Sequence, residues 1–285
     1  MNLCNPKEVQ QIMDTFGLAF KKSLGQNFLI NSMVVEDIAD MCCDRPDATI
    51  LEIGPGVGAL TRELAQRYKN VVALEIDNGL IPVLKFTLGE FANVKVIHQD
   101  VMKADLNAIL KEYFDRGPVS VCANLPYYIT TPILMDLLES GLPFDTITVM
   151  IQKEVADRLC AVPGDKDCGA ITAILNYYGT AERLFSVGKN NYLPAPKVDS
   201  TVIRIRLYKT KPQVPQNEQT FFRVVKAAFE QRRKTLPNAL CVGFPDMTKE
   251  TAANLVTSVG LPSDIRGEKL SVRQFIALSN AITNL

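Results

Sequence analysis

Four consecutive residues, Asn124-Leu125-Pro126-Tyr127, place a side-chain amide, a proline and an aromatic ring directly after the apolar run 119–123. The amide oxygen of Asn124 and a backbone carbonyl beside Pro126 can accept both hydrogens of a heteroaromatic amine. Two such acceptors favour a pyramidal nitrogen whose lone pair is free to attack, as the delocalised N6 of adenine requires. Tyr127 can stack on the ring. A proline after a strand is equally typical of an ordinary turn, so the upstream sequence has to decide.

A glycine-rich turn lies upstream, in the segment Leu51–Gly58 with the sequence LEIGPGVG. It follows a strand pattern and precedes a helix pattern in which Leu60, Leu64 and Tyr68 recur every four residues. Glycines let a backbone approach a ligand closely and let the next helix present its N-terminus. The segment therefore predicts a ligand-binding strand–turn–helix unit.

Two carboxylates are expected on the same rim, since Glu75 follows the apolar run 71–74 and Asp100 follows the run 94–98. In a βαβ unit the first position meets a ribose, and a carboxylate can accept from both ribose hydroxyls. Asp100 could accept from an adenine amino group. A solvated strand end for Glu75 and a turn for Asp100 remain alternative interpretations.

Two cofactors fit this pattern. The residues Gly54–Ala59 satisfy G-x-G-x-x-A, the fingerprint of a nicotinamide dinucleotide site. The segment also reads E-x-G-x-G-x-G, with Glu52 two residues before the first glycine, the form expected for S-adenosylmethionine, which has no pyrophosphate to bind. Carboxylates after successive strands, followed by Asn124, favour S-adenosylmethionine.

Further motifs follow in a fixed order along the chain. They are KSLGQNFL at 22–29, EIGPGVG at 52–58, EID at 75–77, QDV at 99–101, NLPYY at 124–128, QKEVA at 152–156, PAPKVDS at 194–200 and FEQRRK at 229–234. With these motifs the chain resembles the KsgA-type ribosomal RNA adenine dimethyltransferases of the small ribosomal subunit. The resemblance implies transfer of two methyl groups to N6 of each of two adjacent adenosines in an RNA hairpin loop, with S-adenosylmethionine as donor.

The resemblance also implies site residues. The implied contacts to the donor are Asn27, Leu29, Gly54, Glu75, Asp100 and Asn124. Asn124, with Leu125, Pro126 and Tyr127, would form the catalytic loop that holds the target amine and base. Tyr192 stands where the family commonly has Phe, and its ring can still stack, but a buried hydroxyl needs a partner. The segment 168–171 (CGAI) also departs from the expected Tyr-Gly-Arg-Leu form, which concerns local packing.

Charge is unevenly distributed in a chain whose 31 basic and 31 acidic residues cancel. Residues 1–200 carry 18 Lys and Arg against 25 Asp and Glu, whereas residues 201–285 carry 13 against 6. The excess of basic residues in the segment 201–285 is typical of a surface that faces phosphate groups. Apolar spacing predicts a helix over 221–234 that Pro237 helps to end. The candidate RNA contacts are Lys21, Lys22, Tyr192, Arg223, Lys226, Arg232, Arg233 and Lys234.

Composition narrows the setting. The sequence has no run of 18 consecutive apolar residues, so we expect no membrane span. The first residues lack the pattern of a signal or transit peptide. The seven cysteines form no C-x-x-C pair and His98 is the single histidine, so no metal site is expected. Free thiols fit a reducing cytoplasm.

The predicted architecture is α/β, a doubly wound Rossmann-like S-adenosylmethionine-dependent methyltransferase domain with a smaller C-terminal helical domain. Strands are expected near 49–53, 71–76, 94–98, 119–123, 146–151 and 202–207. The polar stretch 209–217 is the expected linker, which divides the chain into a donor-binding domain at 1–208 and a basic, RNA-binding domain at 209–285.

Three other functions stay open. A sister group of enzymes methylates an adenine of large-subunit RNA and confers macrolide resistance, but more often reads Asn-Ile-Pro-Tyr. A non-catalytic assembly factor that binds the immature small subunit would use the same surface. A nicotinamide oxidoreductase would bind a dinucleotide and no methyl donor. A monomer is the default expectation for the oligomeric state.

Overall fold

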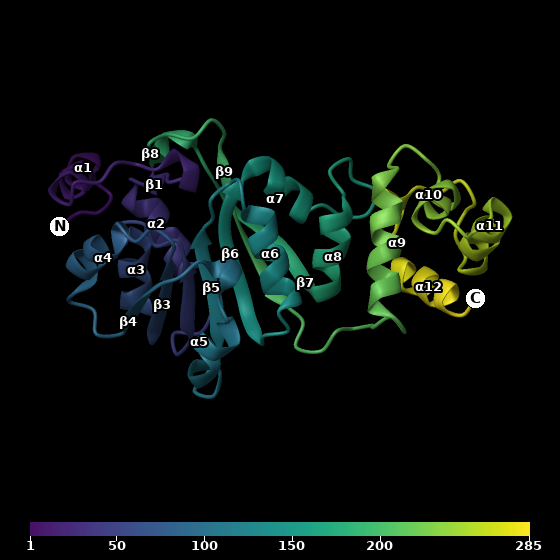
Figure 1. Cartoon of the computed structure of the whole chain (residues 1–285), viewed down its shortest axis with the longest axis horizontal. Coiled ribbons are helices and arrows are strands. Elements are labelled where there is room, and N and C mark those ends of the chain that lie inside the picture. The colour runs from purple at the N-terminus through teal and green to yellow at the C-terminus, as the bar shows by residue number, and fades with distance from the viewer. The chain divides into compact units, whose positions relative to one another are not determined.

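The computed structural model describes residues 1–285 except for the side chain of Lys22. The chain forms two compact units, one of Met1–Ala156 with Glu182–Leu207 and the other of Asp157–Ala181 with Tyr208–Leu285 (Figure 1). The expected division at 208 and 209 differs from these units, because the segment 157–181 clusters with the C-terminal residues. The assignment of separate functions to two domains stays a prediction.

A seven-stranded sheet forms the centre of the first unit, in the order β4-β3-β2-β5-β6-β9-β7. The strands are β2 (Thr49–Ile53), β3 (Asn70–Glu75), β4 (Val94–His98), β5 (Val119–Asn124), β6 (Phe144–Gln152), β7 (Gly179–Val187) and β9 (Ser200–Leu207). The strands from β4 to β6 run parallel, and β9 pairs with β6 antiparallel. This mostly parallel, doubly wound sheet confirms the predicted fold class and all six predicted strands; β7 had not been expected.

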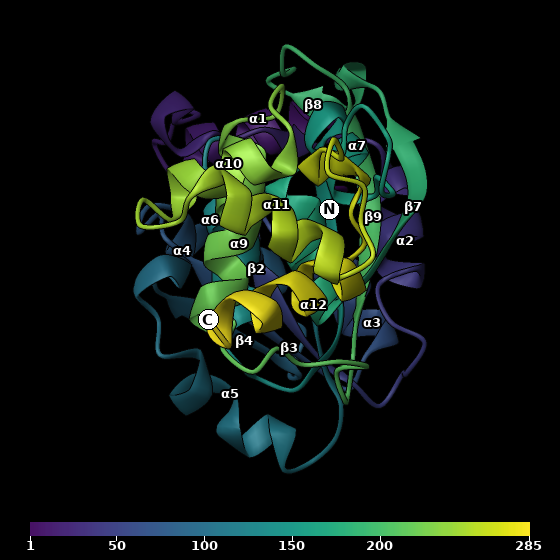
Figure 2. The same ribbon diagram turned by 90° about the vertical axis from the view of Figure 1, so that its right-hand side faces the viewer.

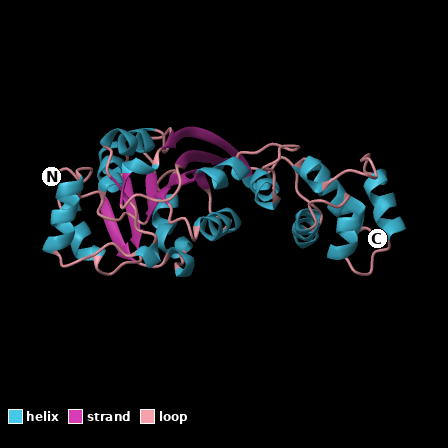
Figure 3. Cartoon of the chain, turned by 90° about the horizontal axis from the view of Figure 1, so that it is seen from above, coloured by secondary structure: helices cyan, strands magenta, loops and turns pink.

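The central strands β2, β3 and β5 are almost continuously buried, as parallel strands covered on both faces should be. Helices lie on both sides of the strands in Figure 3. They are α2 (Ser32–Asp40), α3 (Ala59–Arg67), α4 (Leu80–Leu88), α5 (Leu106–Phe114), α6 (Thr130–Glu139) and α7 (Lys153–Leu159), the last of which crosses the unit boundary. No helix among the described residues is long and apolar enough to cross a membrane.

The N-terminal segment folds over the carboxyl end of this sheet. Helix α1 (Pro6–Thr15) begins at Asn5, whose side chain accepts from the Lys7 N–H, and its Val9 and Met13 are buried. These residues join one apolar cluster with Phe28, Leu80 and Val83. A short strand β1 (Phe28–Leu29) then pairs antiparallel with β8 (Tyr192–Leu193), which brings Leu29 opposite Tyr192.

The second unit is helical, with α8 (Ala170–Tyr178), α9 (Glu218–Glu230), α10 (Leu236–Gly243), α11 (Lys249–Ser258) and α12 (Val272–Thr283) (Figure 2). Helix α9 contacts α8, α10 and α12. The prediction of one helix over 221–234 was wrong at its end, because α9 stops at Glu230. Pro237 lies in the first turn of α10, where a missing N–H costs nothing, and so starts a helix rather than ending one.

Two glycines allow close packing against α9. A Cβ on Gly243 would overlap the Cβ of Ala227, and a Cβ on Gly267 would lie 2.7 Å from the Cβ of Ala228. The backbones of α10 and of the short helix η4 (Gly267–Lys269) therefore approach α9 more closely than any side chain would allow.

We expect Gly243→Ala to lower the free energy of unfolding by about 1–3 kcal/mol, because the added methyl overpacks this contact. Urea unfolding followed by circular dichroism measures the change. Gly188→Ala is the control, since its φ is −67° and the nearest atom to its added Cβ is 3.7 Å away. Equal stability of the two variants would contradict the packing argument.

Candidate functional site

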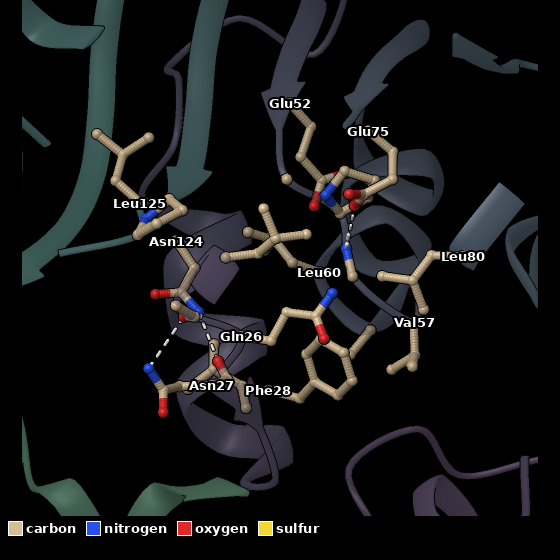
Figure 4. A pocket seen from close by; sticks show the side chains of 18 of the residues that line it. Gln26, Asn27, Phe28, Glu52, Val57, Leu60, Glu75, Leu80, Asn124 and Leu125 are labelled. Carbon is tan, nitrogen blue, oxygen red and sulfur yellow. Dashed lines mark hydrogen bonds between the residues drawn. The ribbon is translucent and has the colours of Figure 1, made fainter. Parts of the chain in front are cut away.

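A pocket lies where the strand order reverses, at the carboxyl ends of β2, β3 and β5. Ligands bind at this position in open α/β sheets. Parallel register places Ile53 beside Leu74 and Glu52 beside Cys122, so the residues that follow each strand share one edge. The lining residues are Leu24, Gly25, Gln26, Asn27, Phe28, Leu29, Glu52, Gly54, Pro55, Gly56, Val57, Ala59, Leu60, Glu75, Ile76, Leu80, Asn124, Leu125, Pro126, Tyr127 and Tyr192 (Figure 4).

The turn after β2 needs its glycines for two different reasons. Gly54 has φ +70° and Gly56 has φ +61°, a left-handed conformation that side chains rarely tolerate. A Cβ on Gly56 would also lie 2.9 Å from the Phe28 ring, whereas a Cβ on Gly54 would meet nothing within 4 Å. The missing side chain of Gly56 therefore lets the Phe28 ring of the N-terminal segment pack against this turn, whereas the space beside Gly54 is open.

Two buried carboxyl groups line one side of the pocket. Glu75 is 4% exposed, and its oxygens accept from the N–H groups of Gly56 (3.3 Å) and Asp77 (2.8 Å). Glu52 is 1% exposed, and its Oε2 has no hydrogen-bond partner among the described residues. Figure 4 shows both carboxyl groups close together, on the other side of the pocket from Asn124.

This crowding changes the ionisation of both acids. Burial raises the pKa of Glu52 to about 8, although the Thr61 hydroxyl works in the opposite direction; the nearby Glu75 adds a smaller upward contribution. Burial also raises the pKa of Glu75, although hydrogen bonds from backbone N–H groups oppose it. A cation bound beside these groups would favour their ionised forms.

The loop after β5 holds a fixed amide. The Nδ2 of Asn124 donates to the carbonyl of Asn27 (3.1 Å), which leaves Oδ1 as the acceptor of that side chain. The Pro126 carbonyl accepts from Ile129 N (3.2 Å) and Thr130 Oγ1 (3.1 Å), so it is already used in the turn. The remaining backbone acceptor beside Pro126 is the carbonyl of Leu125.

Two tyrosine rings complete the wall on this side. The hydroxyls of Tyr127 and Tyr192 each lie 2.6 Å from Ser200 Oγ. Tyr192 is 3% exposed and its hydroxyl also contacts Met150 Sδ at 3.0 Å, so the partner that a buried phenol needs is present.

An ionic contact holds the N-terminal loop across the pocket. Asp77, two residues beyond Glu75, accepts from Lys21 Nζ (2.6 Å) and Gln26 Nε2 (2.8 Å). Burial works to raise the pKa of Asp77, but the hydrogen bonds from Lys21 and Gln26 outweigh it and lower that pKa. The carboxylate is therefore ionised at neutral pH and ties the loop that carries Gln26 and Asn27 to the sheet.

The structure brings most of the predicted residues together. Asn27, Leu29, Gly54, Glu75, Asn124, Leu125, Pro126, Tyr127 and Tyr192 all line the pocket. Asp100 does not; it caps the short helix η2 (Val101–Lys103) through Met102 N and lies 3.9 Å from Lys103. Their roles toward a ligand stay predictions. Sequence reasoning missed the parts of Gln26, Asp77 and Ser200, although each lies in or beside a motif.

The side chains predicted to contact RNA differ in whether they already have hydrogen-bond or ion-pair partners within the protein. Lys21 is paired with Asp77, and the side chain of Lys22 lies outside the described residues. Arg223 donates to the Gly243 carbonyl and lies over the Phe244 ring, while Arg232 donates to Glu268 and to the Lys166 carbonyl. Lys226 is 3.7 Å from Glu230 and 75% exposed.

Arg233 and Lys234 are the freest of these cations. They are exposed, and no described carboxylate pairs with either. Both line a hollow formed by residues 229–234, at the C-terminal end of α9 and in the turn that follows it. Among the described side chains, no three His, Cys, Asp or Glu residues gather as a metal site would require.

A family model and two curated relatives that are similar to this chain are all described as enzymes that methylate ribosomal RNA. The family described as "Ribosomal RNA adenine dimethylase" matches residues 17–284. The "Ribosomal RNA small subunit methyltransferase A" of Geobacillus kaustophilus (strain HTA426) is 46% identical over 287 residues, covering 100% of this chain and 98% of that protein. The protein of the same name from Ligilactobacillus salivarius (strain UCC118) is 46% identical, covering 99% and 97%.

Solved structures have the same fold. The crystal structure of the 23S rRNA methyltransferase ErmE superposes with a TM-score of 0.70 at 25% identity, covering 90% of this chain and 100% of that one. A dimethyladenosine transferase from Plasmodium falciparum superposes with a TM-score of 0.73 at 22% identity, covering 88% and 95%.

We expect Asp77→Asn to loosen the N-terminal loop, because it removes the charge that holds Lys21 and Gln26. The free energy of unfolding should fall by about 1–3 kcal/mol, and hydrogen exchange should quicken over residues 21–27. Asp47→Asn is the control, since its pair with Arg45 is exposed on both sides and should contribute nothing measurable. Unchanged exchange in Asp77→Asn would contradict the role of this contact.

Glu52 should make stability fall as pH rises. Between 4.5, its ordinary pKa, and about 8, the folded protein keeps this carboxyl protonated while the unfolded chain ionises it. The folded state then binds more protons, and this residue lowers the free energy of unfolding by up to about 1.4 kcal/mol per pH unit. Relative to the original chain, Glu52→Gln should gain stability across this window in urea titrations. Parallel pH profiles would contradict the buried, protonated state.

Proposed function

Because the chain belongs to the ribosomal RNA adenine dimethylase family, we propose that it methylates N6 of two adjacent adenosines in a hairpin loop of small-subunit rRNA. The product is N6,N6-dimethyladenosine. The observation that carries this proposal is the pocket in which Asn124, Leu125 and Tyr127 face the same space as Glu52 and Glu75.

The small subunit is favoured over the large subunit by the relatives. Proteins named for the small subunit are 46% identical over the whole chain, whereas the large-subunit enzyme ErmE is 25% identical. The reading Asn-Leu-Pro-Tyr agrees with this choice. A ribosomal substrate in turn supports a cytoplasmic location and a part in small-subunit maturation, and we keep a monomer as the expected state.

S-adenosylmethionine fits the pocket as methyl donor. The lining residues include two buried acids and, among the described side chains, no Lys or Arg. Such a wall suits a cationic ligand and opposes a dianionic pyrophosphate, which argues against a nicotinamide dinucleotide. Glu75 can accept from ribose hydroxyls, while Asn27, Leu29 and Gly54 form the adjoining wall. Asp100 does not line the pocket, so it would contact the adenine of the donor only where the ligand extends past the lining residues.

When bound, this donor supplies a methyl group on a sulfonium, which is already an excellent leaving group. The protein's task is therefore to orient the amine and exclude water. Asn124 Oδ1 and the Leu125 carbonyl accept the two amine hydrogens, and Tyr127 and Tyr192 contact the flat base. The target adenosine has to leave its stack first, which costs least in a loop.

No strong base is needed beside the amine. The pocket's carboxyl groups lie across the pocket from Asn124 (Figure 4), on the side that we assign to the donor. The alkylated nitrogen is strongly acidic, so its proton can pass to water. Phosphate contacts fall to Lys226, Arg233 and Lys234, whose side chains are exposed.

We expect Asn124→Ala to lower methyl transfer by about 10²-fold or more with the fold retained, since it removes one of two acceptors for the amine. The measurement is incorporation of tritiated methyl groups into isolated small-subunit particles at saturating donor, with the modified nucleotides mapped by mass. Asn107→Ala, an exposed asparagine on α5, is the matched control and should keep full activity.

Three outcomes would count against parts of the proposal. Near-normal transfer by Asn124→Ala would remove the assigned role of the amide. Labelling of large-subunit RNA instead would favour the resistance-type enzyme. Affinity for a dinucleotide and none for the methyl donor would favour an oxidoreductase. If the inactive variant still restores ribosome maturation in cells, an assembly function coexists with catalysis.

A further inference from the structure

Ser200 lies between the two aromatic residues assigned to the target base. It is the first residue of β9 and is fully buried, and its backbone pairs with Gln152 of β6. Its Oγ is 2.6 Å from the Tyr127 hydroxyl and 2.6 Å from the Tyr192 hydroxyl. One small side chain on a strand therefore contacts the far ends of two rings, one from the loop after β5 and the other from β8.

The hydrogen-bonding capacity of serine suits this position. A hydroxyl has one hydrogen and two lone pairs, so it can accept from Tyr192 and still exchange a hydrogen bond with Tyr127. Met150 Sδ, at 3.0 Å, is a second acceptor beside the Tyr192 hydroxyl and shares its single hydrogen with Ser200. The three hydroxyls thus form one connected chain inside the wall of the pocket.

This chain has a mechanical consequence. Stacking of a base on an aromatic ring contributes about 1–3 kcal/mol, but only when the ring plane is already in place. A tyrosine held by its hydroxyl cannot tilt freely about its two side-chain torsions. A phenylalanine at 192 would have no such link and would leave Ser200 joined to Tyr127 alone.

We propose that Ser200 is a positioning residue that sets the planes of Tyr127 and Tyr192 together, so that both rings are ready to receive the target adenine. This inference rests on the proposed function. Ser200 touches neither base nor donor in this scheme; it acts through the two phenols.

The test uses a hairpin RNA with the small-subunit loop in which 2-aminopurine replaces one target adenosine. Stacking quenches the fluorescence of this base, and the chain has no tryptophan to interfere. We expect Ser200→Ala to lose at least half of the quenching and to lower kcat on the unmodified RNA about 10-fold or more. Donor affinity should stay within about 2-fold, because the Ser200 side chain contacts only the two tyrosine hydroxyls among the described residues.

A double-mutant comparison makes the test specific. Tyr192→Phe keeps the ring and removes one link, so its loss should be smaller than that of Ser200→Ala. The double variant should equal Ser200→Ala alone if Ser200 acts through Tyr192. Ser120→Ala is the matched control, because Ser120 is also fully buried in the same sheet and bonds Cys43 and Thr146 instead of the pocket residues.

The possible failures are distinguishable. If the original chain neither quenches 2-aminopurine nor transfers methyl groups, the proposed function itself fails. If it does both and Ser200→Ala does the same, only the positioning role is overturned. Additive losses in the double variant would also overturn it. Should Ser200→Ala unfold, Tyr192→Phe decides alone: full quenching and full kcat would contradict the hydroxyl chain.

Discussion

Parallel pairing of β2 with β3 and β5 is the constraint on which the site depends. Because these three strands end at the same edge, a glycine turn, a carboxylate and an amide that are far apart in sequence become neighbours. Nothing in the local sequence of Asn124 requires it to face Glu75. The reversal of strand order between β2 and β5 opens the space between them, since the connecting helices lie on opposite faces there.

Burial of Glu52 and Glu75 then defines what the space can hold. Taking a carboxyl group out of water is costly unless it is neutralised or paired. Here one acid is satisfied by backbone N–H groups and the other keeps an unpartnered oxygen. A compact apolar core would not retain such a group for stability. Thr61 Oγ1, beside Glu52, is also buried and has no hydrogen-bond partner among the described residues, so this corner of the pocket retains polar groups that the fold does not fully pair.

The strands, the glycine turn and most pocket residues could be predicted because they depend on local patterns: apolar runs, turn residues and motifs in order. The pairing of β1 with β8, the tie between Lys21 and Asp77 and the place of Ser200 could not, since each joins residues separated by long stretches of chain. The end of α9 was mispredicted because the helix was extended over the polar residues 231–234, although the apolar spacing ends at Phe229, and because Pro237 was taken to end this helix when it begins α10.

The predictions of RNA-binding residues, which were based on charge, agreed least well with the contacts in the structure. A basic residue can bind RNA or form contacts within the protein, and the sequence alone does not distinguish the two. Arg223, Arg232 and Lys21 each donate to partners within their own unit. The net charge of the chain is zero, so attraction to phosphate has to come from a local excess of basic residues, as in residues 201–285. Under the proposed function, Tyr127, Tyr192 and Asn124 would add recognition of the extruded base at short range.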